Sequence, residues 1–230
     1  MTRLSSRLLR HGAALGVALL LAACGATPKV TGATSGFLPS YDTLKEVSDG
    51  SGTRYLSSGP VGFKGEKIDR VYVEPSRVFP IGVRFPSIDE ATTTRSLQYL
   101  DTTLRAQLVK HFTVVDAPEK AQLVIRPALT RIAAVEEGMK PLDFVPVRLV
   151  TKPLKDAVLG TPQKAAAVLE VLMVDPRNGS VVNAAYRPAT GKETGRSGAG
   201  GEKVSFDAVK PVLDEWATSI SGELVRGLKR

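Results

Sequence analysis

The 230-residue chain is poor in the side chains on which many enzymes and metalloproteins depend. It has one cysteine, two histidines and one tryptophan. A single cysteine excludes an intramolecular disulfide, so the fold must rest on its apolar core. Zinc sites built from histidine and cysteine are excluded too, because so few of these ligands exist. We therefore predict no metal and no cofactor.

Aromatic residues make up only 6% of the chain, and they are not interleaved with basic ones. No block of five or more like charges occurs, which argues against nucleic-acid binding. The formal charge is +8, and 31 basic residues less the three arginines of the amino-terminal 23 residues leave 28 against 23 acidic ones, a net +5. This excess fits either contact with anionic lipid or an ordinary solvated basic surface.

The chain also lacks an apolar run of the roughly 20 residues that a membrane-spanning helix needs. Its longest amino-terminal apolar segment, residues 13–21, follows Arg3, Arg7 and Arg10 and ends in Ala22 and Ala23. Basic residues, a short apolar stretch and small residues form the layout of a bacterial secretory signal peptide. We predict a signal peptide over residues 1–23, cleaved between Ala23 and Cys24.

The sequence Leu21-Ala22-Ala23-Cys24 resembles the lipobox of bacterial lipoproteins. The resemblance implies that the Cys24 thiol carries diacylglycerol and that the new amino terminus is acylated, commonly with palmitate. Two or three acyl chains hold a protein durably on a membrane. The alternative is an ordinary secretory signal with an incidental cysteine.

Gly25 follows the cysteine where an aspartate would signal retention in the inner membrane. By this family rule we expect an outer-membrane anchor facing the periplasm, with the inner membrane or the cell surface as alternatives. Residues 24–35 are small and polar and predict a lipidated flexible tether with a reach of roughly 20 Å. Residues 36–230 have a globular composition and predict a single domain.

Periodicity predicts an α+β fold: one two-layer domain with a mixed β-sheet and amphipathic helices. Residues 68–75 include the β-branched Ile68, Val71 and Val73 and predict a strand that ends at Pro75. Ser87 and Glu90 suggest a capping box for a helix whose apolar stripe ends at His111. Strands at 112–116 and 121–135 complete a β-α-β-β order. Before these elements, the side chains of Phe37, Tyr41 and Leu44 are expected to clamp the start of the domain onto its core.

Asn178-Gly179 lies between two β-rich runs, which is a strong hairpin signal because both residues tolerate positive φ. The carboxy-terminal residues 205–230 predict an amphipathic helix, with Pro211 near the start of its regular part. Its apolar stripe comprises Phe206, Val209, Leu213, Trp216, Ile220, Leu224 and Leu228.

Two segments leave alternatives open. Residues 136–163 carry four prolines but are strongly apolar, so they either pack on their own domain or form a surface for self-association, a partner or the membrane. The glycine-rich residues 190–203 fail the spacing of a phosphate-binding loop. We interpret them as a flexible loop before the last helix.

Candidate catalytic residues are few, and we predict no catalytic site. His111 is expected to be a partly buried structural histidine at a helix end. The adjacent acids Glu136-Glu137 and Asp214-Glu215 are expected to be solvated charges, because adjacency in sequence does not give the separation that a glycosidase needs. We expect a non-catalytic binding or structural module whose partner is an envelope protein, cell-wall polymer or lipid, of unspecified oligomeric state. The alternative is an envelope-polymer hydrolase using carboxylates or a serine.

Several blocks in order resemble the bacterial lipoproteins grouped as domain of unknown function 3313. They are GFLPSYDTLK, KIDRVYVEPSRV, FTVVDAPEKAQLVIRPALT, VPVRLVTKPLKDAVLG and AAVLEVLMVDPRNGSVVNAAYRPATGK. The resemblance covers most of the chain beyond residue 36. It implies an uncharacterised Gram-negative envelope lipoprotein and transfers no active site.

Overall fold

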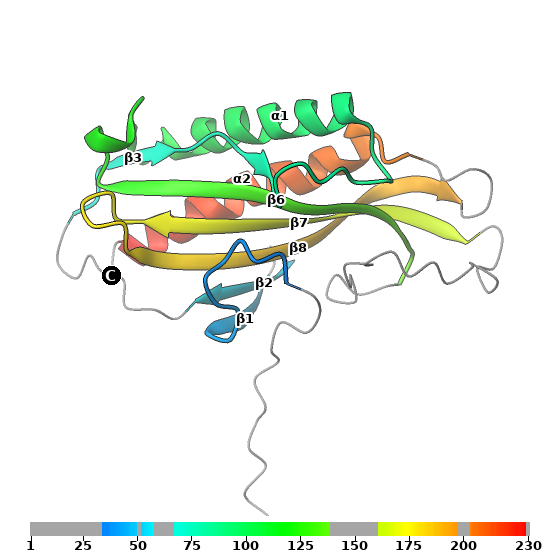
Figure 1. Cartoon of the computed structure of the whole chain (residues 1–230), viewed down its shortest axis with the longest axis horizontal. Helices are drawn as coiled ribbons and strands as arrows, with labels where there is room; N and C mark the ends of the chain where they lie inside the picture. The colour runs from blue at the N-terminus through cyan, green and yellow to red at the C-terminus, as the bar shows by residue number, and fades with distance from the viewer. Residues whose placement is uncertain (1–33, 50–51, 58–66, 139–160, 197–202, 229–230) are drawn as a thin grey trace, which may run out of the picture.

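The computed structural model describes residues 34–49, 52–57, 67–138, 161–196 and 203–228. Their strands are β1 Leu44–Asp49, β2 Gly52–Ser57, β3 Arg70–Val73, β4 Arg77–Val78, β5 Thr113–Val114, β6 Leu123–Glu136, β7 Pro162–Val174 and β8 Val181–Arg196. The helices are α1 Glu90–Leu108 and α2 Phe206–Leu228, with a 3-10 turn at Pro118–Lys120. One sheet in the order β1-β2-β8-β7-β6-β3-β5, with β4 paired to β6, packs against both helices (Figure 1). The predicted α+β class is confirmed.

The strands from β3 to β6 form the parallel part of the sheet. β3 lies between β5 and β6 and is parallel to both, with α1 connecting β4 to β5. The predicted β-α-β-β order is therefore present. The predicted cap is wrong: Asp89, not Ser87, caps α1, because its side chain accepts hydrogen bonds from the backbone N–H of Thr92 at 2.7 Å and the hydroxyl of Thr92 at 3.0 Å.

The rest of the sheet is antiparallel, from β6 through β7, β8 and β2 to β1. The predicted hairpin joins β7 to β8. Only Gly179 adopts a positive φ, of 72°, and the turn closes through backbone hydrogen bonds between Asp175 and Ser180 and between Gly179 and Asp175. The hairpin of β1 and β2 was not predicted from the sequence.

The two faces of the sheet bury different partners. Alternate residues of β7, from Ala165 to Met173, face the helices and join the larger apolar cluster. The predicted stripe of α2 is buried there from Phe206 to Leu224. The helix begins at Phe206, so Pro211 lies inside it rather than at its start. Neither described helix combines the length and apolarity needed to cross a membrane.

The opposite face is covered by residues 34–43, the entry segment, drawn in blue in front of β8 in Figure 1. Phe37, Leu38 and Leu44 are buried in a second apolar cluster with Val168 and Tyr186. The predicted clamp at the start of the domain is confirmed. The segment thus enters the domain on the face away from the helices.

Candidate functional site: a cavity beneath the 79–89 loop

The segment from Phe79 to Asp89 connects β4 to α1 and stands away from the helix. It begins with a cis peptide bond between Phe79 and Pro80, and Gly82 turns it with a φ of 82°. Phe85 and Ile88 are buried and fasten its second half to the core. Residues 80–84 of the loop are exposed, so the loop contacts the core mainly through Phe85 and Ile88.

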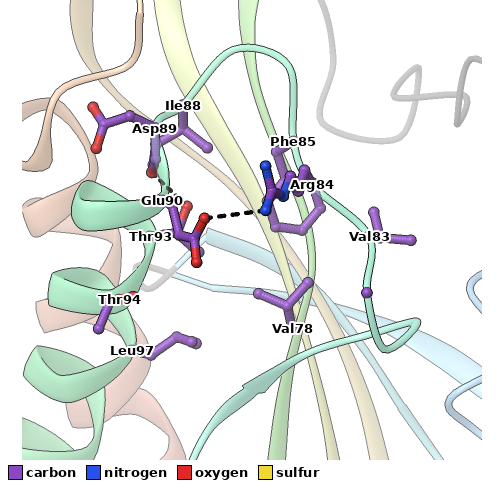
Figure 2. A pocket seen from close by; sticks show the side chains of 11 residues that line it. Val78, Val83, Arg84, Phe85, Ile88, Asp89, Glu90, Thr93, Thr94 and Leu97 are labelled. Atoms are coloured by element: carbon purple, nitrogen blue, oxygen red, sulfur yellow. Dashed lines mark hydrogen bonds and ion pairs between the residues drawn. The ribbon is translucent and has the colours of Figure 1, made fainter.

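A cavity of about 580 Å³ lies between this loop and the first half of α1. Its volume is within the range of ordinary small-molecule sites. Figure 2 shows the loop and the helix as its two walls. The lining residues are Val78, Gly82, Val83, Arg84, Phe85, Ile88, Asp89, Glu90, Thr93, Thr94 and Leu97. The walls are mainly apolar, and the polar groups come from the loop and the first turns of α1.

Polar groups in the cavity wall are already engaged in structural contacts. Arg84 reaches from the loop toward Glu90 at 3.4 Å, an exposed ion pair drawn in Figure 2. The hydrogen bonds from Thr92 lower the pKa of the Asp89 carboxyl below its usual value, so Asp89 is a carboxylate at neutral pH. The Thr93 hydroxyl donates to the Asp89 carbonyl oxygen at 2.9 Å. This arrangement suits an apolar ligand group with a polar end at the rim.

Two buried charged residues lie on adjacent strands but on opposite faces of the sheet. Glu170 of β7 pairs in register with Tyr186, and the next position of β8, Arg187, faces α2. Arg187 is 1% exposed and contacts the Glu223 carboxylate, while its Nη1 donates to the Ser219 hydroxyl at 2.9 Å. Arg54 of β2 lies against the same carboxylate of Glu223. We interpret these groups as structural, because they fill the contacts between the sheet and its two covering layers.

The predicted lipidation site cannot be placed on the fold. Ala23, Cys24 and most of the tether lie outside the described residues, as do residues 139–160 of the apolar proline-containing segment and 197–202 of the glycine-rich one. Residues 190–196, predicted as loop, instead continue β8 and pair with β7 as far as Arg196.

The predicted position of His111 near a helix end is confirmed, but its predicted partial burial is wrong. The side chain is exposed and lies beyond the last residue of α1, Leu108, rather than on the buried stripe. The helix ends three residues earlier than the periodicity suggested. A turn then leads to β5. The backbone N–H groups of His111 and Phe112 both donate to the Leu108 carbonyl oxygen in this turn.

The two pairs of adjacent acids lie on different elements, at the end of β6 and within α2. Just after the end of β6, the Glu137 carboxylate forms an ion pair with the Lys164 ammonium group, with the two atoms 2.5 Å apart. On α2, burial would by itself raise the pKa of Asp214, but hydrogen bonds from Lys210 and Tyr99 hold it below its ordinary value. Both bonds measure 2.6 Å. Asp214 is thus half-buried and paired, not simply solvated as predicted.

Sequence reasoning missed both the cavity and the buried charges. A single charge inside an apolar strand, as in AAAVLEVLMV or AAYRPA, was the available signal for Glu170 and Arg187. The signal for the loop was the apolar run between Pro80 and Pro86. Among the described residues no group of three or more histidine, cysteine, aspartate or glutamate side chains could hold a metal ion.

These features define an α+β domain with a mixed sheet, two helices on one face and a loop-covered apolar cavity. The family model described as "Protein of unknown function (DUF3313)" matches residues 33–220, and the chain belongs to this family. It is 24% identical over 201 residues to the uncharacterized lipoprotein YdcL of Escherichia coli (strain K12), an alignment covering 86% of this chain and 89% of that protein.

The solved structures to which the chain is similar are more distant. The PelC dodecamer from Paraburkholderia phytofirmans is 15% identical, with a TM-score of 0.34, over 76% of this chain and 95% of that one. The lipoprotein GNA1162 from Neisseria meningitidis is 11% identical, with a TM-score of 0.33, over 69% of this chain and 99% of that one. These values are too low to transfer a site or an assembly.

Proposed function

We propose that this protein is a lipoprotein of the bacterial cell envelope, anchored through a diacylglycerol thioether on Cys24 and an acylated amino terminus. The lipobox sequence supports the modification, and the lipoprotein relative YdcL supports the class. Gly25 favours export to the outer membrane over retention in the inner one. The domain then stands on the periplasmic side, tethered by residues 24–35.

The domain itself is proposed to be a non-catalytic binding module that takes an apolar group of a lipid or envelope partner. The observation that carries this proposal is the cavity of about 580 Å³ with its mainly apolar wall. The carboxylates nearest to it cap α1 or pair with Arg84. Such fixed charges can orient a ligand at the rim, whereas acid–base catalysis needs a group free to exchange its proton.

The lipid anchor is tested with a Cys24→Ala variant expressed in the native bacterium. The variant should lose incorporation of labelled fatty acid and remain unprocessed, because both lipidation and cleavage require the thiol. A variant that is cleaved normally and released as a soluble protein would refute the lipobox assignment.

The binding role is tested by photo-crosslinking in cells. A photoreactive amino acid at Thr94, in the cavity wall, should capture a defined partner or lipid that the same group at Lys110 does not. Lys110 is a matched control, because it is exposed just beyond the other end of α1. Equal capture at both positions would contradict a ligand site in the cavity.

Activity assays provide the opposite test. A strain that carries His111→Ala or Asp214→Asn should show the same cell phenotype as a strain with the native protein, wherever the variant domain remains folded. Loss of that phenotype in a folded Asp214→Asn variant, together with turnover of an envelope polymer by the native protein, would replace the binding role by a hydrolase.

A further inference from the structure

We propose that the loop from Phe79 to Pro86 is a membrane-contact surface, in which Ile81 and Val83 enter the interface of an anionic phospholipid bilayer while Arg77 and Arg84 face its phosphates. The inference rests on the proposed anchor at Cys24, which would keep the domain beside a bilayer. It adds a fixed orientation of the domain to that anchor.

The loop presents apolar side chains to solvent. Ile81 is 83% exposed and Val83 is 42% exposed, although burial of such side chains is strongly favoured. Gly82 between them has a positive φ, and a Cβ added there would meet nothing within 4 Å. The exposed run continues from Pro80 to Arg84. Ile81 projects at the turn, and Val83 is partly exposed while it also lines the cavity.

Two arginines flank this apolar tip. The Arg84 side chain is 87% exposed, and Arg77 is exposed at the start of β4. Asp89 is occupied in capping α1. The Arg84–Glu90 pair is exposed and 3.4 Å long, and such pairs contribute little to stability, so a phosphate can replace Glu90 as the partner of Arg84. Apolar side chains beside long cationic ones are typical of segments at a lipid interface, where the charged ends reach the phosphates.

The loop lies beside the point where the tether joins the domain. The rings of Phe37 and Phe79 meet edge to face with centroids 5.3 Å apart, and the Arg77 guanidinium carbon lies 5.7 Å from the Phe37 ring centroid. The proposed tether of residues 24–35 would have a reach of roughly 20 Å. Since the first described residues lie close to this loop, a lipid on Cys24 would hold the loop toward the bilayer.

The size of the patch favours a membrane over a protein partner. A stable protein interface buries about 800 Å² on each side. The side chains of Ile81 and Val83 cannot supply that area. A lipid-anchored domain needs only enough additional contact to fix its orientation, because the acyl chains already provide attachment.

The experiment uses tryptophan as a depth reporter in the full protein made by the native bacterium. Ile81→Trp and Val109→Trp variants are reconstituted into vesicles of phosphatidylethanolamine and phosphatidylglycerol, with or without brominated acyl chains. Val109 is a matched control, because it is 58% exposed and apolar but lies at the far end of α1. The native Trp216 is 1% exposed in the core and gives a constant background.

Ile81→Trp emission should shift to shorter wavelength on vesicles and be quenched by bromolipid, while Val109→Trp emission should not. The Ile81→Trp quenching should fall when phosphatidylglycerol is replaced by phosphatidylcholine, because the arginines then lose anionic partners. Val83→Trp provides a second reporter if Ile81→Trp perturbs the loop. Equal behaviour at positions 81, 83 and 109 would overturn the contact surface.

The mass of the purified protein reports lipid on Cys24 independently of fluorescence. A lipidated protein without quenching at positions 81 and 83 would overturn the loop contact and leave the anchor standing. Quenching in a protein without lipid would support the loop contact and refute the anchor.

Discussion

Tyr41 donates a hydrogen bond of 2.6 Å from its hydroxyl to the Glu170 carboxylate, across 129 residues of chain. The same hydroxyl accepts from the backbone N–H of Gly36 at 3.2 Å. It therefore links the entry segment to the centre of β7, on the sheet face opposite the helices. Burial and the bond to Glu170 together raise the pKa of Tyr41 to about 12.

Replacing this tyrosine tests the link. Tyr41→Phe keeps the ring but removes the donor to a carboxylate that is 1% exposed. We expect the free energy of unfolding to fall by about 1–3 kcal/mol, the usual cost of removing a hydrogen-bond partner from a buried polar group. Urea denaturation followed by circular dichroism measures this. Ser40→Ala, which removes a solvent-exposed turn bond, should change stability little; equal effects of the two variants would contradict the link.

The pH dependence of stability should carry the signature of Glu170. Burial raises the pKa of this carboxyl above its ordinary value of 4.5. The folded state then binds the proton more tightly than the unfolded chain. The stabilisation of the folded state by this tighter proton binding is fully present below pH 4.5. It is lost as the pH rises through the folded-state pKa of Glu170. Glu170→Gln should therefore flatten the decline above pH 4.5, measured by urea denaturation at a series of pH values. Identical slopes for the two proteins would rule out this role.

The close approach of β8 to α2 depends on Gly191. A Cβ at this position would overlap the backbone oxygen of Ala208, and backbone cannot rotate away as a side chain can. Gly191→Ala should lower the free energy of unfolding by about 1–3 kcal/mol, as overpacking does. Gly227→Ala is the control. A Cβ there meets nothing within 4 Å, and alanine should be neutral or stabilise the helix by up to about 1 kcal/mol. Equal thermal shifts for both variants would show that the contact does not constrain the fold.

The fold was predictable where local patterns and tertiary packing agree. The stripes of both helices, the β7–β8 hairpin and the clamp of Phe37 and Leu44 follow from periodicity and turn chemistry. The errors came where two local signals compete. Ser87 and Asp89 both suit a helix cap, and only the geometry at Thr92 selects Asp89. Likewise, the glycines near 191 suggested a loop, but pairing with β7 extends the strand.

The candidate site was not predictable because it depends on the distance between elements. Whether the 79–89 loop packs on α1 or stands away from it cannot be read from the order of its residues. The charges of Glu170 and Arg187 were visible in the sequence, but their partners lie more than 30 positions away, on the entry segment and on α2. The strands β1 and β2 were missed because their short polar sequences lack a clear alternation.

Arg187, Arg54 and Glu223 give the sharpest test of the helix-facing layer. Burial lowers the pKa of the Arg187 guanidinium, an effect that the Glu223 carboxylate opposes. Glu223→Ala removes the carboxylate between two buried guanidiniums and should lower the free energy of unfolding by about 3–5 kcal/mol. A triple variant, Arg54→Leu with Arg187→Met and Glu223→Leu, should recover most of this loss, because buried ion pairs are often replaceable by apolar residues. Differential scanning calorimetry compares the variants with Asp116→Asn, which breaks an exposed pair with Lys120. A Glu223→Ala variant no less stable than Asp116→Asn would mean that the buried carboxylate does not hold β2 and β8 to α2.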